Sequence, residues 1–191
     1  EGSAEMRALL GNKGANLAEM VHVLGEDRVP GGFTITTAAC TAYREGGEMP
    51  DGLEGQIEEA LRALESESGR RLGDPVDPLL VSVRSGAPVS MPGMLDSVLN
   101  LGLNEAAVEG LAERSGDPHM AWDSRRRLIQ MFSEVVRGVD AMAFEDALVE
   151  ARHVNGVEVD SDLDQAALKA LAGRYLEIFR QQTGEDFPED P

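Results

Sequence analysis

Apolar residues recur at helical spacing through most of the second half of the chain. Spacings of three and four residues place them on one face of each of four predicted amphipathic helices. Asn104, Asp117 with Pro118, and Asp164 are residue types that start helices, and Gly184 follows the last predicted helix. The four apolar faces consist of Val108, Leu111 and Ala112; Leu128, Phe132, Val135 and Val139; Phe144, Leu148 and Ala151; and Leu168, Leu171, Tyr175, Ile178 and Phe179.

The first half mixes signals in the order helix, strand, helix, helix, strand. Two short β-branched runs, Phe33–Thr36 and Leu79–Val83, predict strands. Thr37 is the expected cap of the helix after the first strand, and Asp51 with Glu54 forms a capping box before the next helix. Two strands are too few for a complete sheet. The apolar faces of the first and third helices consist of Leu17, Met20, Val21 and Leu24, and of Leu53, Ile57, Leu61 and Leu64.

We therefore predict the α+β class. Residues 1–104 are expected to form an incomplete α/β part and residues 105–191 an all-α part. Hydrophobic residues make up 42% of the chain and aromatic residues 4%, so the core must consist mainly of aliphatic side chains.

The chain is strongly acidic, with a formal net charge of −18. Such a surface repels nucleic acid and anionic membranes, and we expect neither as a partner. The single cysteine, Cys40, excludes an internal disulfide and is expected to be buried in a helix. No apolar run is long enough for a membrane span and no secretion signal is visible, so a cytoplasmic protein is expected.

One stretch, LLVSVRSGAPVSMPGMLDSVLNLGLN, contains a single arginine and a single aspartate. Its arginine, Arg84, follows the predicted strand and precedes a loop of glycine, serine and proline. A guanidinium in this place suits an anion, because its planar donors match phosphate oxygens. It is equally suited to pairing with one of the many acidic side chains, and both interpretations stay open.

A second basic residue lies in the motif Gly11-Asn12-Lys13-Gly14. Because the first helical pattern follows directly, Lys13 is expected at or near a helix N-terminus. The N–H groups and the dipole of a helix favour an anion there, which would offset the unfavourable position of the lysine. A solvated lysine beside a glycine turn is the alternative.

These motifs resemble those of one enzyme family. The stretch VSVRSGAPVSMPGMLDSVLNLGLN is similar to the N-terminal nucleotide-binding domain of pyruvate, phosphate dikinase. The resemblance continues through GNKGANLAEM, GFTITTAACTAY, AWDSRRRLIQMFSEVV and TGEDFPEDP, and so covers essentially the whole chain. It implies an ATP-grasp-type fold that binds ATP with Mg²⁺. The implied reaction converts ATP, phosphate and pyruvate to AMP, pyrophosphate and phosphoenolpyruvate, with a histidine on another domain carrying the phosphate.

The resemblance also implies roles for individual residues. Lys13 and Arg84 match the phosphate-binding lysine and the essential arginine of the family, so they are the expected catalytic and ATP-binding residues. Ser90, Met91 and Gly93 match a loop near the ATP phosphates. The Mg²⁺ ligands are expected outside this chain, and no metal site within it. The catalytic histidine is also expected elsewhere, because His22, His119 and His153 lack its Thr-Ser-His-Ala setting.

Arg125, Arg126 and Arg127 are consecutive on a predicted helix, where they point about 100° apart and cannot form one pincer. A solvated basic patch is one interpretation. The resemblance implies another, in which Arg126 and Arg127 meet the phosphohistidine domain and Arg127 makes the docking contact.

The chain departs from the family pattern at two places. Asn12 replaces a glycine beside the expected phosphate site, and Pro88-Val89 replaces Arg-Ala, with the loss of one positive charge.

Other functions stay open beside the dikinase. One is a non-catalytic paralogous module that acts in regulation or assembly. Another is a related dikinase such as phosphoenolpyruvate synthase, against which the MPGM loop argues. We expect the chain to be a piece of a longer, homo-oligomeric enzyme and to be inactive alone.

Overall fold

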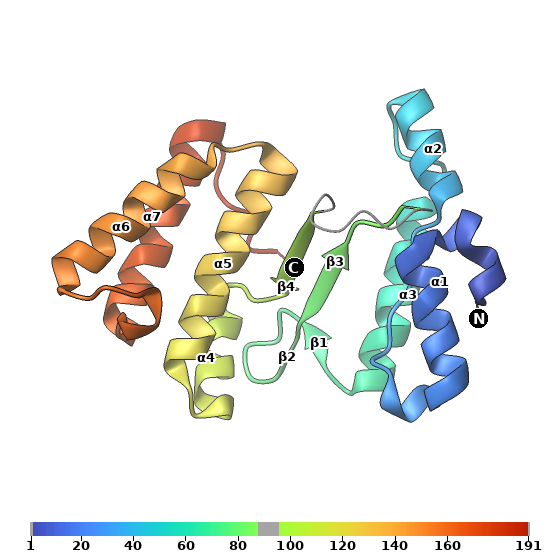
Figure 1. Ribbon diagram of the computed structural model, residues 1–191, viewed down its shortest axis with the longest axis horizontal. Helices are drawn as coiled ribbons and strands as arrows, with labels where there is room; N and C mark the ends of the chain where they lie inside the picture. The colour runs from blue at the N-terminus through green and yellow to red at the C-terminus, as the bar shows by residue number, and fades with distance from the viewer. Residues whose placement is uncertain (1, 88–95, 191) are drawn as a thin grey trace. The chain divides into compact units, whose positions relative to one another are not determined.

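The structure is a computed structural model that describes residues 2–87 and 96–190. By contacts, the chain divides into two units (Figure 1). The first unit comprises Glu1–Gly69 and Arg84–Asp96, and the second comprises Arg70–Val83 and Ser97–Pro191. Helices predominate and the strands are short, as expected of the α+β class.

The first unit is mainly helical, and its first helix is interrupted. Gly11 has φ 69° and ψ 171°, which is not a helical conformation, so the helix restarts at Asn12. The expectation that Lys13 lies near a helix N-terminus is confirmed at this restart. The helical elements of the unit are η1 (Ala4–Met6), α1 (Arg7–Leu24), η2 (Glu26–Arg28), α2 (Thr37–Gly46) and α3 (Leu53–Ser68).

Both α2 and α3 begin differently from the prediction. Thr36, not Thr37, caps α2, because its Oγ1 accepts a hydrogen bond from Ala39 N at 3.3 Å. Thr37 Oγ1 instead donates to Ala8 O at 2.7 Å and ties the start of α2 to α1. The prediction that Asp51 and Glu54 form a capping box before α3 is wrong. The N-cap is Gly52, which has the left-handed conformation and makes no side-chain capping bond.

The predicted strand Phe33–Thr36 is also wrong. None of the described strands includes or pairs with this segment, and the side chains of Phe33 and Ile35 are exposed. A strand needs the hydrogen bonds of a neighbouring strand, which an apolar, β-branched run does not supply by itself.

The apolar core of the first unit is small in the part that the structure describes. Its buried hydrophobic residues are Ala15 and Val29, whereas Leu17 and Met20 on the predicted face of α1 remain exposed. Cys40 is exposed on α2, and its predicted burial is therefore wrong, since α2 buries none of its residues.

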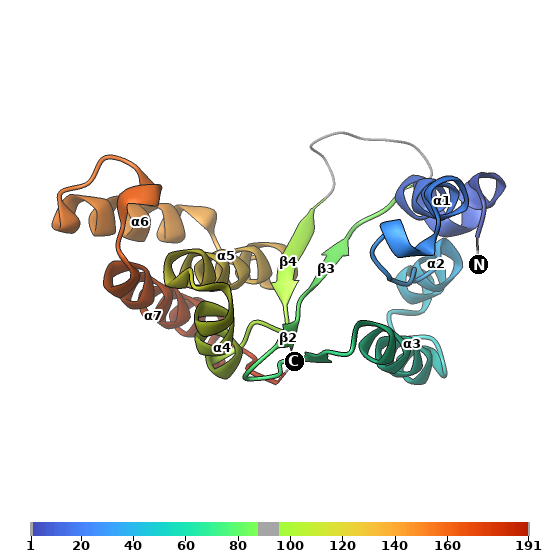
Figure 2. The same cartoon turned by 90° about the horizontal axis from the view of Figure 1, so that it is seen from below.

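The described strands form two sheets of two strands each. β1 (Arg71–Leu72) pairs in parallel with β2 (Pro78–Leu79). β3 (Val81–Arg84) pairs with β4 (Ser97–Leu101), and Figure 2 shows these two strands side by side. The predicted strand Leu79–Val83 is thus divided between β2 and β3, and Arg84 ends β3.

The helices of the second unit pack together (Figure 1). This unit contains most of the described buried apolar side chains. The predicted caps are confirmed, because Asn104, Asp117 and Asp164 each accept a backbone hydrogen bond, at 2.8, 2.9 and 2.8 Å. The helical elements are α4 (Glu105–Ser115), α5 (Pro118–Arg137), α6 (Ala141–Asn155), η3 (Asp160–Asp162) and α7 (Gln165–Thr183).

The predicted apolar faces are confirmed for α7 and wrong in part for α5. All five residues of the α7 face are buried. On α5, Leu128 is buried but Val135 is 41% exposed, and the buried face instead includes Arg125, Ile129 and Ser133. Within the described residues, no helix has both the length and the apolar character needed to cross a membrane.

Candidate functional site

Two distant segments of the first unit meet at the break in α1. Asn12 N donates a hydrogen bond to Ala87 O at 2.8 Å, and Lys13 Nζ donates to Ser85 O at 2.6 Å. A Cβ on Gly11 would lie 3.5 Å from Ala87 N, so this glycine also packs against the same segment. Lys13 is therefore held against the residues that directly follow Arg84, although Lys13 and Ser85 lie 72 positions apart.

Gly11 makes this arrangement possible through its backbone conformation. Its φ of 69° lies in the region that glycine adopts without strain and that other residues disfavour. The break it introduces creates a new helix start inside α1, and Lys13 is the second residue after the break. The positive end of the helix dipole and the lysine ammonium consequently lie on the same turn.

The Lys13 ammonium retains donors for a ligand. An ammonium group has three N–H donors, and the bond to Ser85 O uses one of them. No described carboxylate lies within ion-pair distance of Lys13. In a chain with a net charge of −18, such a cation raises the local potential for an anion.

Arg84 is exposed at the end of β3, and it forms no ion pair with any described carboxylate. No described carboxylate therefore supports the alternative in which Arg84 pairs with an acidic side chain. Exposure without a described ion pair is not specific to Arg84, because the same unit has three other arginines of this kind: Arg7, Arg28 and Arg44. The contact of Lys13 with Ser85 is what distinguishes Arg84 from these arginines.

The loop residues Ser90, Met91 and Gly93 lie outside the described residues, as does Pro88-Val89. Their expected place near the ATP phosphates stays a prediction.

A third segment reaches the same turn through Thr34, whose place beside Lys13 was not apparent from the sequence. A Cβ on Gly14 would lie 3.1 Å from Thr34 Oγ1, so the threonine side chain covers Gly14 directly. The signal in the sequence is a glycine inside a helical pattern, at the position that follows Lys13.

The three consecutive arginines of α5 occupy different environments in the second unit. Arg125 and Arg126 are only 2% and 4% exposed, so a solvated basic patch is wrong for these two. Arg125 Nη1 donates to Leu103 O at 2.8 Å and its Nη2 pairs with Glu189. Burial lowers the pKa of Arg125, and the charge of Glu189 partly offsets that effect.

Arg126 and Arg127 share one carboxylate. Asp123 Oδ1 accepts from Nε and Nη2 of Arg126 at 3.0 and 2.5 Å, and Asp123 Oδ2 pairs with Arg127 Nε at 2.8 Å. The Arg127 side chain is 60% exposed, whereas that of Arg126 is 4% exposed. Of the three arginines, Arg127 is therefore the one whose guanidinium reaches solvent.

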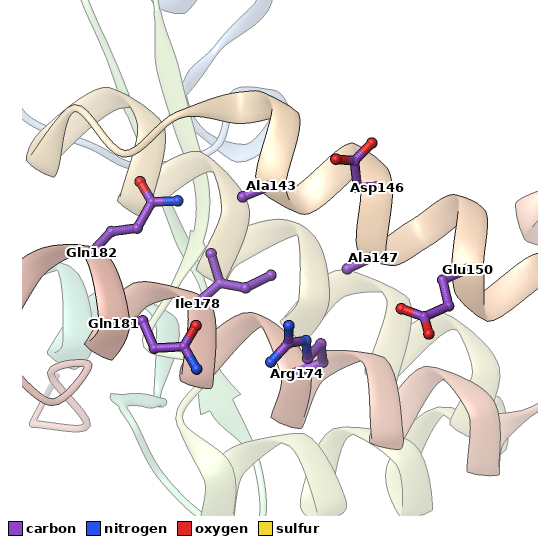
Figure 3. Close-up of a pocket in the computed structure, with 8 residues that line it drawn as sticks. All are labelled: Ala143, Asp146, Ala147, Glu150, Arg174, Ile178, Gln181 and Gln182. Carbon is purple, nitrogen blue, oxygen red and sulfur yellow. The ribbon is translucent and has the colours of Figure 1, made fainter.

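A groove of about 230 Å³ lies between α6 and α7 of the second unit (Figure 3). Its lining is mixed, with carboxylates on α6, amides on α7 and small or apolar side chains between them. Arg174 at its edge already pairs with Glu177 at 2.9 Å. None of the predicted site residues lines the groove, which consists of Ala143, Asp146, Ala147, Glu150, Arg174, Ile178, Gln181 and Gln182.

The part of the chain that the structure describes contains no cluster of three or more His, Cys, Asp or Glu side chains able to hold a metal ion. His22 and His153 are exposed, and His119 Nε2 is buried without a hydrogen-bond partner among the described atoms.

Curated proteins match the whole chain. The chain is 49% identical over 193 residues to pyruvate, phosphate dikinase of Clostridium symbiosum, and 50% identical over 192 residues to that of Rhizobium meliloti. It is 48% identical over 192 residues to the chloroplastic pyruvate, phosphate dikinase of Flaveria pringlei. These matches cover 100% of this chain but 22%, 21% and 20% of the relatives, so the chain spans about a fifth of their length. The resemblance seen in the sequence motifs is confirmed. No family model matches the chain.

Proposed function

We propose that this chain, a homologue of the pyruvate, phosphate dikinases along its whole length, forms part of their nucleotide-binding region. Lys13 and Arg84 would bind the phosphates of ATP. The enzyme would then pass phosphate from ATP to a histidine on another domain, with AMP, pyrophosphate and phosphoenolpyruvate as the products of ATP, phosphate and pyruvate.

The hydrogen bond from Lys13 Nζ to Ser85 O carries this proposal. It joins the helix start that holds Lys13 to the residue that follows Arg84, within one unit of the chain. The ammonium thus contacts the residue next to the one that carries the guanidinium, and both cations suit a polyphosphate because they stabilise negative charge on phosphate oxygens. Such groups act electrostatically in phosphoryl transfer, since they hold charge that moves onto the leaving phosphates.

Because the chain is strongly acidic, these two cations are especially important for ATP binding. ATP is repelled by a net charge of −18, so its binding requires a local positive field. Each charge-assisted contact contributes about 1.5–3 kcal/mol, which corresponds to about a 10- to 150-fold change in affinity.

Asn12 lies at this turn where the family pattern has a glycine. Its backbone N–H already donates to Ala87 O, so this amide is not a donor for phosphate. Phosphate contacts at the turn therefore fall to Lys13 and to groups beyond Asn12. Mg²⁺ would accompany ATP, and because the described residues offer no metal cluster, we assign it no ligand in this chain.

Arg127 is proposed to contact the phosphohistidine domain of the longer enzyme. Its Nε is held by Asp123, which leaves the Nη groups of an exposed guanidinium for an anionic partner. Arg126, also expected at this interface, is buried and paired with Asp123, so any effect on docking would act through that carboxylate.

ATP titration by calorimetry tests the proposal, on this chain and on the longer protein that carries the phosphohistidine domain. Arg84→Ala and Lys13→Ala are each expected to weaken ATP binding about 10- to 150-fold. Arg44→Ala is the matched control, since Arg44 is an exposed cation of the same unit, and its effect should stay within about twofold. Equal affinities for the wild type, Arg84→Ala and Lys13→Ala would contradict the proposal.

Phosphate transfer gives an independent measurement. In the longer protein, Arg84→Ala should abolish labelling of the histidine by ATP. This chain alone should form no phosphoenolpyruvate, and turnover by the isolated chain would show that its role has been misassigned.

A further inference from the structure

The backbone conformation of Gly14 does not require a glycine. Its φ is not positive, in contrast to Gly11 three residues earlier. An alanine would ordinarily be favoured in a helix by about 0.5–1 kcal/mol. The absence of a side chain at Gly14 must therefore have a reason outside its own conformation.

The reason is the approach of Thr34. A Cβ on Gly14 would lie 3.1 Å from Thr34 Oγ1 and 3.4 Å from Thr34 Cγ2, and 3.2 Å from Leu10 Cβ. The first and last of these distances are tighter than ordinary van der Waals contact. Gly14 thus leaves the space into which the Thr34 side chain extends, over the first turn of the restarted helix.

Two neighbouring threonines fix the backbone of this segment through hydrogen bonds of their hydroxyl groups, whereas the hydroxyl of Thr34 is not used in this way. Thr36 Oγ1 accepts a hydrogen bond from Ala39 N, and Thr37 Oγ1 donates to Ala8 O at 2.7 Å. Both bonds anchor the segment that carries Thr34 to the starts of α2 and α1. Thr34 is exposed and forms no hydrogen bond to another described residue, so its O–H is available as a donor.

We propose that the Thr34 hydroxyl is a further phosphate-binding group of this site. It stands over Gly14, the residue next to Lys13, on the turn where the helix dipole and the ammonium favour an anion. A hydroxyl donates one hydrogen bond to a phosphate oxygen and adds no charge. Thr34 therefore orients the phosphate chain that Lys13 and Arg84 attract, and Gly14 is the glycine that lets it do so. This inference rests on the proposed function.

The test compares three substitutions at Thr34 in the ATP titrations of the longer protein. Thr34→Val and Thr34→Ala remove the hydroxyl, and each should weaken ATP binding about 3- to 10-fold. Thr34→Ser keeps the hydroxyl and should bind ATP within about twofold of the wild type. Melting temperatures measured alongside show whether each variant is folded.

A ligand series separates binding from a structural role. Tripolyphosphate binding should weaken with Thr34→Val as ATP binding does, whereas adenosine binding should not change. Gly14→Ala, which displaces the threonine, should reproduce the loss for tripolyphosphate. The role of Thr34 alone would be overturned if Thr34→Val and Thr34→Ala both bind ATP like the wild type while Arg84→Ala binds it weakly. No ATP binding by the wild type would overturn both the role of Thr34 and the proposed function.

Discussion

Replacing Gly110 on α4 with alanine tests how closely this helix packs against the turn before β2. A Cβ on Gly110 would lie 1.9 Å from Pro75 O, 2.7 Å from Pro75 C and 3.0 Å from Val76 Cα. All three atoms belong to the backbone, so no side-chain rotation relieves the overlap. Either α4 or the turn must move, and close-packed interiors resist such movement.

The expected magnitude follows from two opposing effects. Alanine gains about 0.5–1 kcal/mol over glycine in a helix interior. Overpacking of a well-packed site costs about 1–3 kcal/mol, and a backbone overlap as severe as this one belongs at the upper end. We therefore expect Gly110→Ala to lower the free energy of unfolding by about 2 kcal/mol.

Gly173→Ala on α7 is the matched control, because a Cβ on Gly173 meets nothing within 4 Å. Only the helix preference of alanine acts there, and a gain of about 0.5–1 kcal/mol is expected. Urea unfolding followed by fluorescence measures both variants, since Trp122 is the only tryptophan and is buried in the second unit. If Gly110→Ala proves as stable as Gly173→Ala, the reasoning from backbone contact is refuted.

Two further predictions concern charges and the buried tyrosine of the second unit. Glu189→Gln removes the charge that faces buried Arg125. Because Glu189 itself is 42% exposed, we expect the free energy of unfolding in urea to fall by about 1–3 kcal/mol. Glu185→Gln, at an exposed position, is the control and should lower it less. Burial raises the pKa of Tyr175 above 10.0, so the folded state holds the phenol proton more tightly than the unfolded state. The corresponding stability is present below about pH 10 and is lost as the pH rises further, so Tyr175→Phe should flatten the alkaline decline in melting temperature. Tyr43→Phe, at an exposed position, should leave that decline unchanged, and equal profiles for the two variants would contradict the role of burial.

The helices of the second half were accessible from the sequence because their signals are local. Asn104, Asp117 and Asp164 each bond an amide three residues further along, so a short window of sequence contains both the cap and its partner. The apolar face of α7 follows in the same way from a repeat within one element. Local signals were less decisive at α2, where Thr36 and Thr37 are adjacent and chemically equal candidates for the cap.

Other errors fall where a residue depends on a distant partner. Phe33–Thr36 has the residue types of a strand but no described strand beside it. Arg125 has the charge of a surface residue, yet it is buried because Glu189 and the Leu103 carbonyl, far along the chain, satisfy its donors. Periodicity alone gives no information about such partners, because the residue type is the same whether a buried charge is paired or not.

The sequence by itself determined which residue types are available to bind an anion: Lys13 in a glycine turn that starts a helix, and Arg84 at the end of a strand. Only the tertiary structure decided that the Lys13 ammonium bonds to Ser85, and that Thr34 covers Gly14. A hydrogen bond between residues 72 positions apart depends on the path of the chain between them, which is set by the packing of whole elements. The positive φ of Gly11 supplies the break in α1 at which those distant segments meet.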